Sequence, residues 1–173
     1  MRHNRGFTLI ELMVAVGLLA VLATLAAPSM GDFIVRQRVA SQAGDLAVAM
    51  ALARSEAIKG NTSVTVMPLT VSTTGWSDGW CVAPAAVADC SDAAVLRRFA
   101  SRTTVSIASA GLASPFRITF LRDGTRGVNS GRPGFKVSSA QLPAARPDAR
   151  CVLLTSQGRT EVAAVTRDDA CPQ

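Results

Sequence analysis

The sequence has no tyrosine and only one histidine, His3, among its 173 residues. A histidine supplies the base of a Ser-His or Cys-His nucleophile pair and the usual proton carrier near neutral pH, so a single one argues against such chemistry. Paired carboxylates can act without histidine, but the twelve Asp and Glu residues are spread along the chain in no recognisable constellation. We therefore expect a protein that is not an enzyme, with no catalytic residue, no metal site and no cofactor.

Charged residues are also missing from the apolar run 12–27. A helix over residues 7–27 rises about 32 Å, which matches a bilayer core of about 30 Å. Two arginines precede the run and no basic residue follows it until Arg36, a bias that holds the amino terminus on the cytoplasmic side. We therefore predict a transmembrane helix over residues 7–27, followed by an exported domain. A cleaved secretory signal shares the basic head and the apolar run, but it is cut after that run.

The stretch 6–11, GFTLIE, resembles the class III signal of type IV pilins and type II secretion pseudopilins. The resemblance implies that a prepilin peptidase cuts between Gly6 and Phe7 on the cytoplasmic face and methylates the new amino terminus of Phe7. Residues 1–6 are then a leader peptide, and its removal takes away His3. The apolar helix remains as a membrane anchor and later becomes part of a filament core.

Glu11 is the one carboxylate in this segment. Inside a bilayer a charged side chain costs about 3 kcal/mol, so a retained carboxylate needs a partner. By resemblance, the partner is the methylated amine of Phe7 on a neighbouring subunit, and Glu11 sets the axial register of the filament. The alternative is that Glu11 lies close enough to the membrane interface to stay hydrated.

The four cysteines lie beyond the apolar run, in the part that we expect to be exported, where disulfides persist. Zinc binding is the rival interpretation, but no C-x-x-C spacing is present and no histidine completes a ligand set. Four cysteines allow three pairings, and sequence alone does not choose among them. We favour Cys81 with Cys90, which closes a short loop, and Cys151 with Cys171, which ties the carboxyl tail to a strand.

Beyond the apolar run, a second helical pattern leads to Gly60-Asn61, which can end a helix. We predict one helix from about Phe7 to about Ile58, bent or loosened near Pro28, with 28–60 as its periplasmic half. Its apolar positions recur every three or four residues and should face a sheet: Leu46, Met50, Ala53 and Ala57. Four polar positions should face water: Arg36, Arg38, Gln42 and Asp45.

Residues 61–173 contain short strand patterns separated by turn signals. We predict strands at 63–67, 79–83, 95–99, 103–107, 116–121, 134–138, 151–155 and 160–165. We expect a loop or hairpin tip at 68–78, and turns at Asp123-Gly124 and Gln157-Gly158. The predicted fold class is α+β, with the long amino-terminal helix packed on an antiparallel β-sheet domain.

Several blocks resemble the GspH and FimT/FimU branch of the pilin superfamily: ARSEAI at 53–58, VTV at 64–66, WSDGW at 76–80, ITF at 118–120 and LLTSQGR at 153–159. The resemblance implies a pilin-like fold and a minor subunit that helps to start or cap a type IV pilus. A GspH-type pseudopilin of a type II secretion system and a DNA-uptake subunit share that fold and are the alternatives. The implied partners are prepilin peptidase, other minor pilins or pseudopilins, the major pilin, the inner-membrane assembly platform and membrane lipid.

Positive charge is concentrated in the later part of the chain. Residues 97–159 contain eleven Lys or Arg against two Asp, whereas residues 32–92 contain four basic and six acidic residues. Such a surface attracts polyanions, and some FimT-type pilins bind DNA through a Gly-Arg-x-Arg motif. The matching stretch is GRTE at 158–161, with a carboxylate in place of the second arginine. The candidate DNA contacts are Arg132, Lys136, Arg146, Arg150 and Arg159, and the alternative is a solvated basic surface facing acidic neighbours or anionic lipid.

Overall fold

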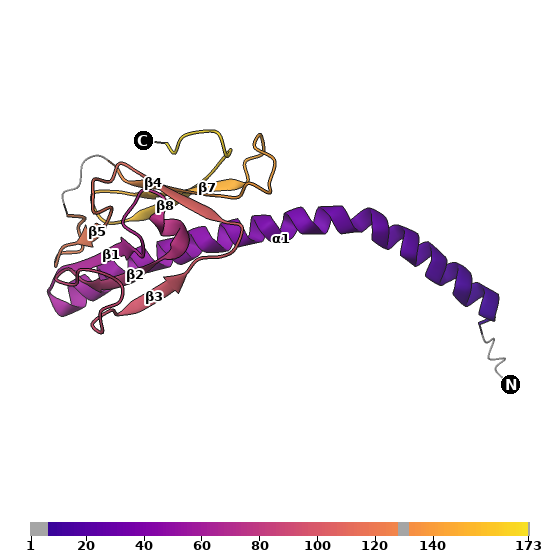
Figure 1. Cartoon of the computed structure of the whole chain (residues 1–173), viewed down its shortest axis with the longest axis horizontal. Helices are drawn as coiled ribbons and strands as arrows, with labels where there is room; N and C mark the ends of the chain where they lie inside the picture. Colours follow the sequence, from indigo (N-terminus) through magenta and orange to yellow (C-terminus); the bar gives the residue numbers. More distant parts are fainter. Residues whose placement is uncertain (1–6, 128–131, 173) are drawn as a thin grey trace. The chain divides into compact units, whose positions relative to one another are not determined.

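The computed structural model describes residues 7–127 and 132–172 (Figure 1). The chain divides into two compact units, residues 1–34 and residues 35–173. One long helix, α1 (Leu9–Gly60), contributes to both units. Gly6 and the rest of the leader predicted at 1–6 lie outside the described residues.

The first unit is the amino-terminal part of α1. Its helix begins at Leu9, close to the predicted start, and is continuous through position 28, so the bend that we predicted there stays a prediction. Fourteen large apolar side chains in this unit are exposed: Phe7, Leu9, Ile10, Leu12, Met13, Val14, Val16, Leu18, Leu19, Val21, Leu22, Met30, Phe33 and Ile34. Among the described residues, no helix meets the joint requirement of length and hydropathy for crossing a bilayer.

In the second unit, α1 buries one face and ends at the predicted position. Leu46, Met50, Ala53 and Ala57 are fully buried, as the spacing predicts. The helix ends at Gly60, where Asn61 adopts a positive φ of 46°. The amides of residues 61 and 62 donate to the carbonyls of residues 58 and 57, a pattern that satisfies the last carbonyls of a helix.

Gln42 corrects one of our predictions. It is 1% exposed, and its Nε2 donates to the carbonyl of Ala100 at 3.3 Å. The reason is the helical period, because residue 42 lies one turn before Leu46 and beside Val39 and Ala43 on the buried face. The expectation that Gln42 faces water followed its polarity rather than its position and was wrong.

Within residues 7–127 and 132–172, eight strands form two antiparallel four-stranded sheets. The first sheet has the order β3-β2-β1-β5, with β1 (Val64–Pro68), β2 (Gly79–Pro84), β3 (Arg97–Ala100) and β5 (Ile118–Phe120). The second has the order β4-β6-β7-β8, with β4 (Ser106–Ala110), β6 (Gly134–Ser138), β7 (Ala149–Leu154) and β8 (Thr160–Val165). Every predicted strand is confirmed in type, although β3 and β4 begin two to three residues later than predicted.

A short 3-10 helix, η1 (Gly75–Asp78), was not predicted within the loop 68–78. The Ser77 hydroxyl fastens it to β4, accepting from the Ile107 amide at 2.8 Å and donating to the Ile107 carbonyl at 3.1 Å. Trp76 is fully buried, with its ring edge against Phe135 and the ring centroids 4.6 Å apart. One apolar core therefore joins residues of α1, η1 and both sheets.

Both predicted disulfides are confirmed. Cys81 bonds to Cys90, and Cys151 in β7 bonds to Cys171 near the carboxyl end. The first disulfide closes the segment after β2, where Arg98 Nε donates to the carbonyl of Cys90 at 2.7 Å. The described residues contain no free cysteine.

Candidate assembly segment and basic groove

Thr8 and Glu11 cap the amino-terminal end of α1. The Glu11 amide donates to Thr8 Oγ1 at 3.3 Å, and the Thr8 amide donates to Glu11 Oε2 at 3.3 Å. This reciprocal arrangement is a capping box, which satisfies two of the unpaired amides at a helix start. The sequence signal was available, because Thr-x-x-Glu is the spacing of a capping box, but our sequence analysis did not use it.

The capping box gives Glu11 a second role besides the predicted pairing between subunits. In the single chain its carboxylate is already bonded to the amide and hydroxyl of Thr8, both contacts at 3.3 Å. These contacts lie at the exposed tip of the helix, so the carboxylate stays accessible to a further cation. Phe7 is also accessible, with 88% of its surface exposed.

Two of the five predicted DNA contacts lie on opposite faces of the second sheet. In the β6–β7 pair, Lys136 stands opposite Cys151, and Arg150 is the next residue along β7. Because side chains alternate along a strand, Lys136 and Arg150 point to opposite faces. Lys136 Nζ donates to the carbonyls of Arg167 and Asp169 at 2.8 and 3.0 Å, so it holds the carboxyl-terminal segment in place.

The other predicted contacts differ in how far they are engaged by the chain itself. Arg132 Nη2 lies 2.9 Å from Glu161 Oε2, so the carboxylate that departs from the Gly-Arg-x-Arg pattern neutralises this arginine. Arg146 and Arg159 are both exposed. Within the described ranges, no hydrogen bond or ion pair is formed by the side chain of Arg159.

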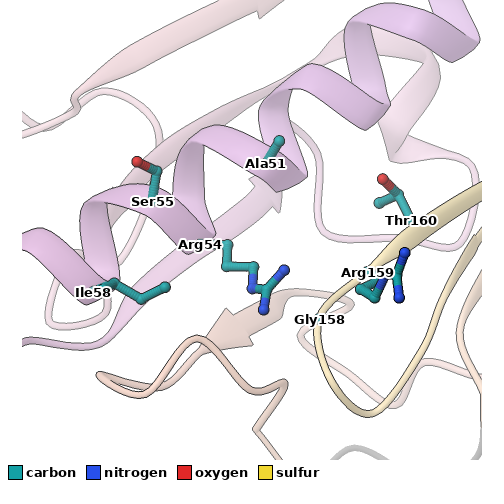
Figure 2. A pocket seen from close by; sticks show the side chains of 7 residues that line it. All are labelled: Ala51, Arg54, Ser55, Ile58, Gly158, Arg159 and Thr160. Carbon is teal, nitrogen blue, oxygen red and sulfur yellow. The ribbon is translucent and has the colours of Figure 1, made fainter.

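Arg159 lines a groove between α1 and the turn that joins β7 to β8 (Figure 2). The groove has a volume of about 600 Å³ and is lined by Ala51, Arg54, Ser55, Ile58, Gly158, Arg159 and Thr160. Figure 2 shows the Arg54 side chain extending from the helix toward the turn that carries Gly158 and Arg159. Arg54 was not among the predicted site residues, because no sequence signal places it beside Arg159.

Two glycine turns position this groove. Gly158 has a φ of 74°, and a Cβ there would overlap the carbonyl oxygen of Gly124. Gly124 has a φ of 78°, and its carbonyl accepts a hydrogen bond from Arg54 Nε at 3.1 Å.

The first of these turns is also fixed by Asp123, the residue before Gly124. Its carboxylate accepts hydrogen bonds from the hydroxyl and amide of Thr125, at 2.6 and 2.9 Å, and these hydrogen bonds lower the pKa of the carboxyl. The predicted turns at Asp123-Gly124 and Gln157-Gly158 are therefore confirmed and pack on one another.

A sequence profile described as "Type II transport protein GspH" matches residues 42–158, about two thirds of the chain. The chain belongs to the GspH family. A second profile, the "Prokaryotic N-terminal methylation motif", matches residues 1–27 of this GspH-family chain. The two profiles together cover the exposed helix and most of the folded domain.

Solved structures of minor pilins share the fold of this GspH-family protein. The minor pilin FimU of Pseudomonas aeruginosa is 22% identical, with 71% of this chain and 90% of FimU covered at a TM-score of 0.55. The minor pseudopilin EpsH of Vibrio cholerae, from its type 2 secretion system, is 13% identical, with 73% of this chain and 97% of EpsH covered at a TM-score of 0.52. The predicted pilin-like fold is thus confirmed.

A curated relative matches a shorter stretch. The type IV major alpha-pilin of Moraxella bovis is 33% identical over 64 residues, which are 37% of this chain and 40% of that pilin. The chain therefore matches less than half the length of this relative.

Proposed function

We propose that the protein is a minor pilin, assembled into the initiating or tip complex of a type IV pilus after cleavage between Gly6 and Phe7 and methylation of Phe7. The observation that carries this proposal is the exposed apolar helix. The fourteen large apolar side chains named above are each at least 46% exposed, and those within the helix occupy every side of it. A helix that is apolar all round needs a bilayer or other protein around it. The anchor in the inner membrane and the filament core supply these two environments in turn.

The role proposed for Glu11 in assembly rests on charge. Its carboxylate lies at the tip of this apolar helix, beside the exposed Phe7 whose amine is freed by cleavage. In the low dielectric of a filament core, an ammonium and a carboxylate from adjacent subunits compensate each other's desolvation. The match to the N-terminal methylation motif supports this use of residues 1–27.

Charge and capping at Glu11 can be separated by two variants. Glu11→Gln keeps a side chain that can complete the capping box but removes the charge, whereas Glu11→Ala removes both. We expect both variants to enter filaments about tenfold less than wild type, measured by immunoblotting of sheared filament fractions. Normal incorporation of Glu11→Gln would contradict the ionic role and leave capping as the function of this residue.

A pseudopilin of a type II secretion system is the second candidate, and the profile described as a type II transport protein favours it. Both readings use the same helix and the same processing. Deletion of the gene separates them, because loss of piliation or twitching supports the pilus and loss of exoprotein release supports secretion. We infer from the family that neither system uses this chain as an enzyme.

DNA binding stays a prediction. The opposite orientations of Lys136 and Arg150 and the Arg132–Glu161 pair weaken the case for one continuous phosphate-binding surface. Arg146 and Arg159 are exposed, so both side chains are accessible to a phosphate group. A gel shift at low salt with a random-sequence duplex, compared between wild type and Arg159→Ala, measures it directly, and DNA that stays unshifted would contradict it.

A further inference from the structure

The groove beside Arg54 and Arg159 contains positive charge without a compensating carboxylate. None of its seven lining residues is acidic. The Arg54 side chain uses Nε to bond the Gly124 carbonyl at 3.1 Å, a contact that fixes the guanidinium without neutralising it. Two guanidinium groups held at the edge of one concave site favour an anion between them.

The acidic residues closest in sequence are directed elsewhere. Glu161 follows Thr160 in β8, and alternation along the strand sends its side chain to the other face, where it pairs with Arg132 at 2.9 Å. Glu56 lies on α1 and pairs with Lys59 at 3.2 Å. Neither carboxylate lines the groove, so an anion there must come from another molecule.

We propose that this groove binds the carboxylate of an acidic side chain on a neighbouring subunit of the filament. This proposal rests on the assembly function proposed above. Arg54 and Arg159 bind the carboxylate, the hydroxyls of Ser55 and Thr160 offer further hydrogen bonds, and Ala51 and Ile58 contact the aliphatic part of the incoming side chain. The groove therefore gives the folded domain its own contact in the assembly, separate from the contact made by the apolar helix.

A carboxylate side chain fits this site better than a nucleic-acid backbone does. A phosphate backbone requires a row of cations along one surface. Here Arg132 is already paired with Glu161, and Lys136 is engaged with the carboxyl-terminal segment. A groove of about 600 Å³ lined by two arginines and by apolar Ala51 and Ile58 instead has room for a whole acidic side chain, with charge for its carboxylate and apolar contacts for its carbon atoms.

The test uses the full-length protein in cells that assemble filaments. A photo-crosslinking residue, p-benzoylphenylalanine, replaces the exposed Gln157, which precedes Gly158 in the turn and does not line the groove, and crosslinked peptides are mapped by mass spectrometry. We expect crosslinks to an Asp- or Glu-containing segment of another pilin-like subunit. We expect Arg159→Glu to lower the crosslinking yield about tenfold, because hydrogen bonds between charged groups are lost. Replacing the crosslinked acidic residue by Arg should then restore the yield in the Arg159→Glu background.

Two controls make the outcomes decisive. Arg122→Glu carries the same charge change at an exposed arginine that does not line this groove, so it should leave the yield unchanged. Immunoblotting of sheared filament fractions for the wild-type protein tests the assembly function itself, because its absence from filaments would count against that function and not against the groove. An Arg159→Glu yield equal to that of wild type would overturn the proposal, and so would equal losses of yield in Arg159→Glu and Arg122→Glu. Crosslinks to DNA in place of protein would also overturn it. The Arg159 side chain forms no hydrogen bond or ion pair among the described residues, and the hydrogen bonds between residues 155 and 159 use its backbone, so its replacement is not expected to unfold the domain.

Discussion

In residues 35–172 the large apolar side chains Trp76, Trp80, Phe120 and Phe135 are fully buried, whereas in residues 7–34 every large apolar side chain named above is exposed. The two regions thus differ in whether the chain itself supplies the surroundings that apolar surface requires. Among the described residues, the folded domain buries its apolar side chains in a main core and a smaller cluster, and it contains two sheets and two disulfides. The helix in residues 9–34 satisfies its backbone hydrogen bonds and has a capping box, but its large apolar side chains named above are left exposed. The domain therefore covers its own apolar surface, whereas the helix requires a bilayer or other protein to cover its apolar surface.

Replacing Trp76 is expected to cause the largest loss in the free energy of unfolding and to separate the two regions most clearly. Trp76→Ala removes a fully buried ring that packs against Phe135, so it should lower the free energy of unfolding by about 3–5 kcal/mol. The matched change in the other region is Leu18→Ala, where 62% of the side chain is exposed, and it should shift domain unfolding by less than about 0.5 kcal/mol. Urea unfolding of both full-length variants in detergent measures this. Similar losses in the two variants would break the comparison.

The disulfides are expected to have the next largest effect. Replacing Cys151 and Cys171 together by Ala frees the carboxyl segment and should cost about 3 kcal/mol, with a slightly smaller cost for the shorter Cys81–Cys90 loop. Thermal unfolding with and without reductant checks both values. A wild-type protein whose unfolding is insensitive to reductant, despite reduced cysteines, would contradict a stabilising role.

Two glycines offer a smaller and sharper test. Gly158→Ala should destabilise the domain by about 1–3 kcal/mol, because its φ is 74° and the added Cβ overlaps the Gly124 carbonyl. Gly44→Ala is the opposite case, since a Cβ at this helical position meets nothing within 4 Å, and it should stabilise the protein by about 0.5–1 kcal/mol. A urea midpoint that Gly158→Ala leaves unchanged or raises would contradict the packing of the two turns.

The smallest expected effect is on acid stability. Thr125 lowers the pKa of Asp123 below its ordinary value of 3.8, so this carboxylate contributes stability above that value and loses it as the pH falls through the lowered folded-state pKa. Asp123→Asn should therefore lower the free energy of unfolding slightly near neutral pH, and this difference from wild type should disappear as the pH falls through the lowered pKa of Asp123. Denaturant midpoints from neutral pH into the acid range measure the difference. A difference between the two proteins that grows as the pH falls below about 4 would be inconsistent with this carboxyl.

The fold was largely predictable from the sequence, because strand patterns, Gly turns and apolar spacing act locally. The pairing of Cys81 with Cys90 and the end of α1 at Gly60 were predicted for the same reason. Gln42 was predicted wrongly because polarity conflicted with helical position, and position prevailed. The capping box was readable but unused, and η1 was hidden in a Ser- and Thr-rich loop.

The groove was less predictable, since it depends on contacts between distant segments. Arg54 and Arg159 are 105 positions apart in the sequence, and only the packed glycine turns bring them to one site. Likewise, the net charge of a segment does not show which Lys and Arg side chains donate hydrogen bonds to backbone carbonyls of the same chain. Lys136 and Arg150 belong to one basic region of the sequence but to opposite faces of the sheet.

The central claim is that the apolar helix is retained after processing and becomes covered only by a membrane or by neighbouring subunits. Intact-mass spectrometry of the protein extracted from membranes tests it most directly. The account predicts a chain that begins at Phe7, carries one added methyl group and retains the whole helix. A chain that still carries residues 1–6, or one that begins beyond residue 27, would contradict it.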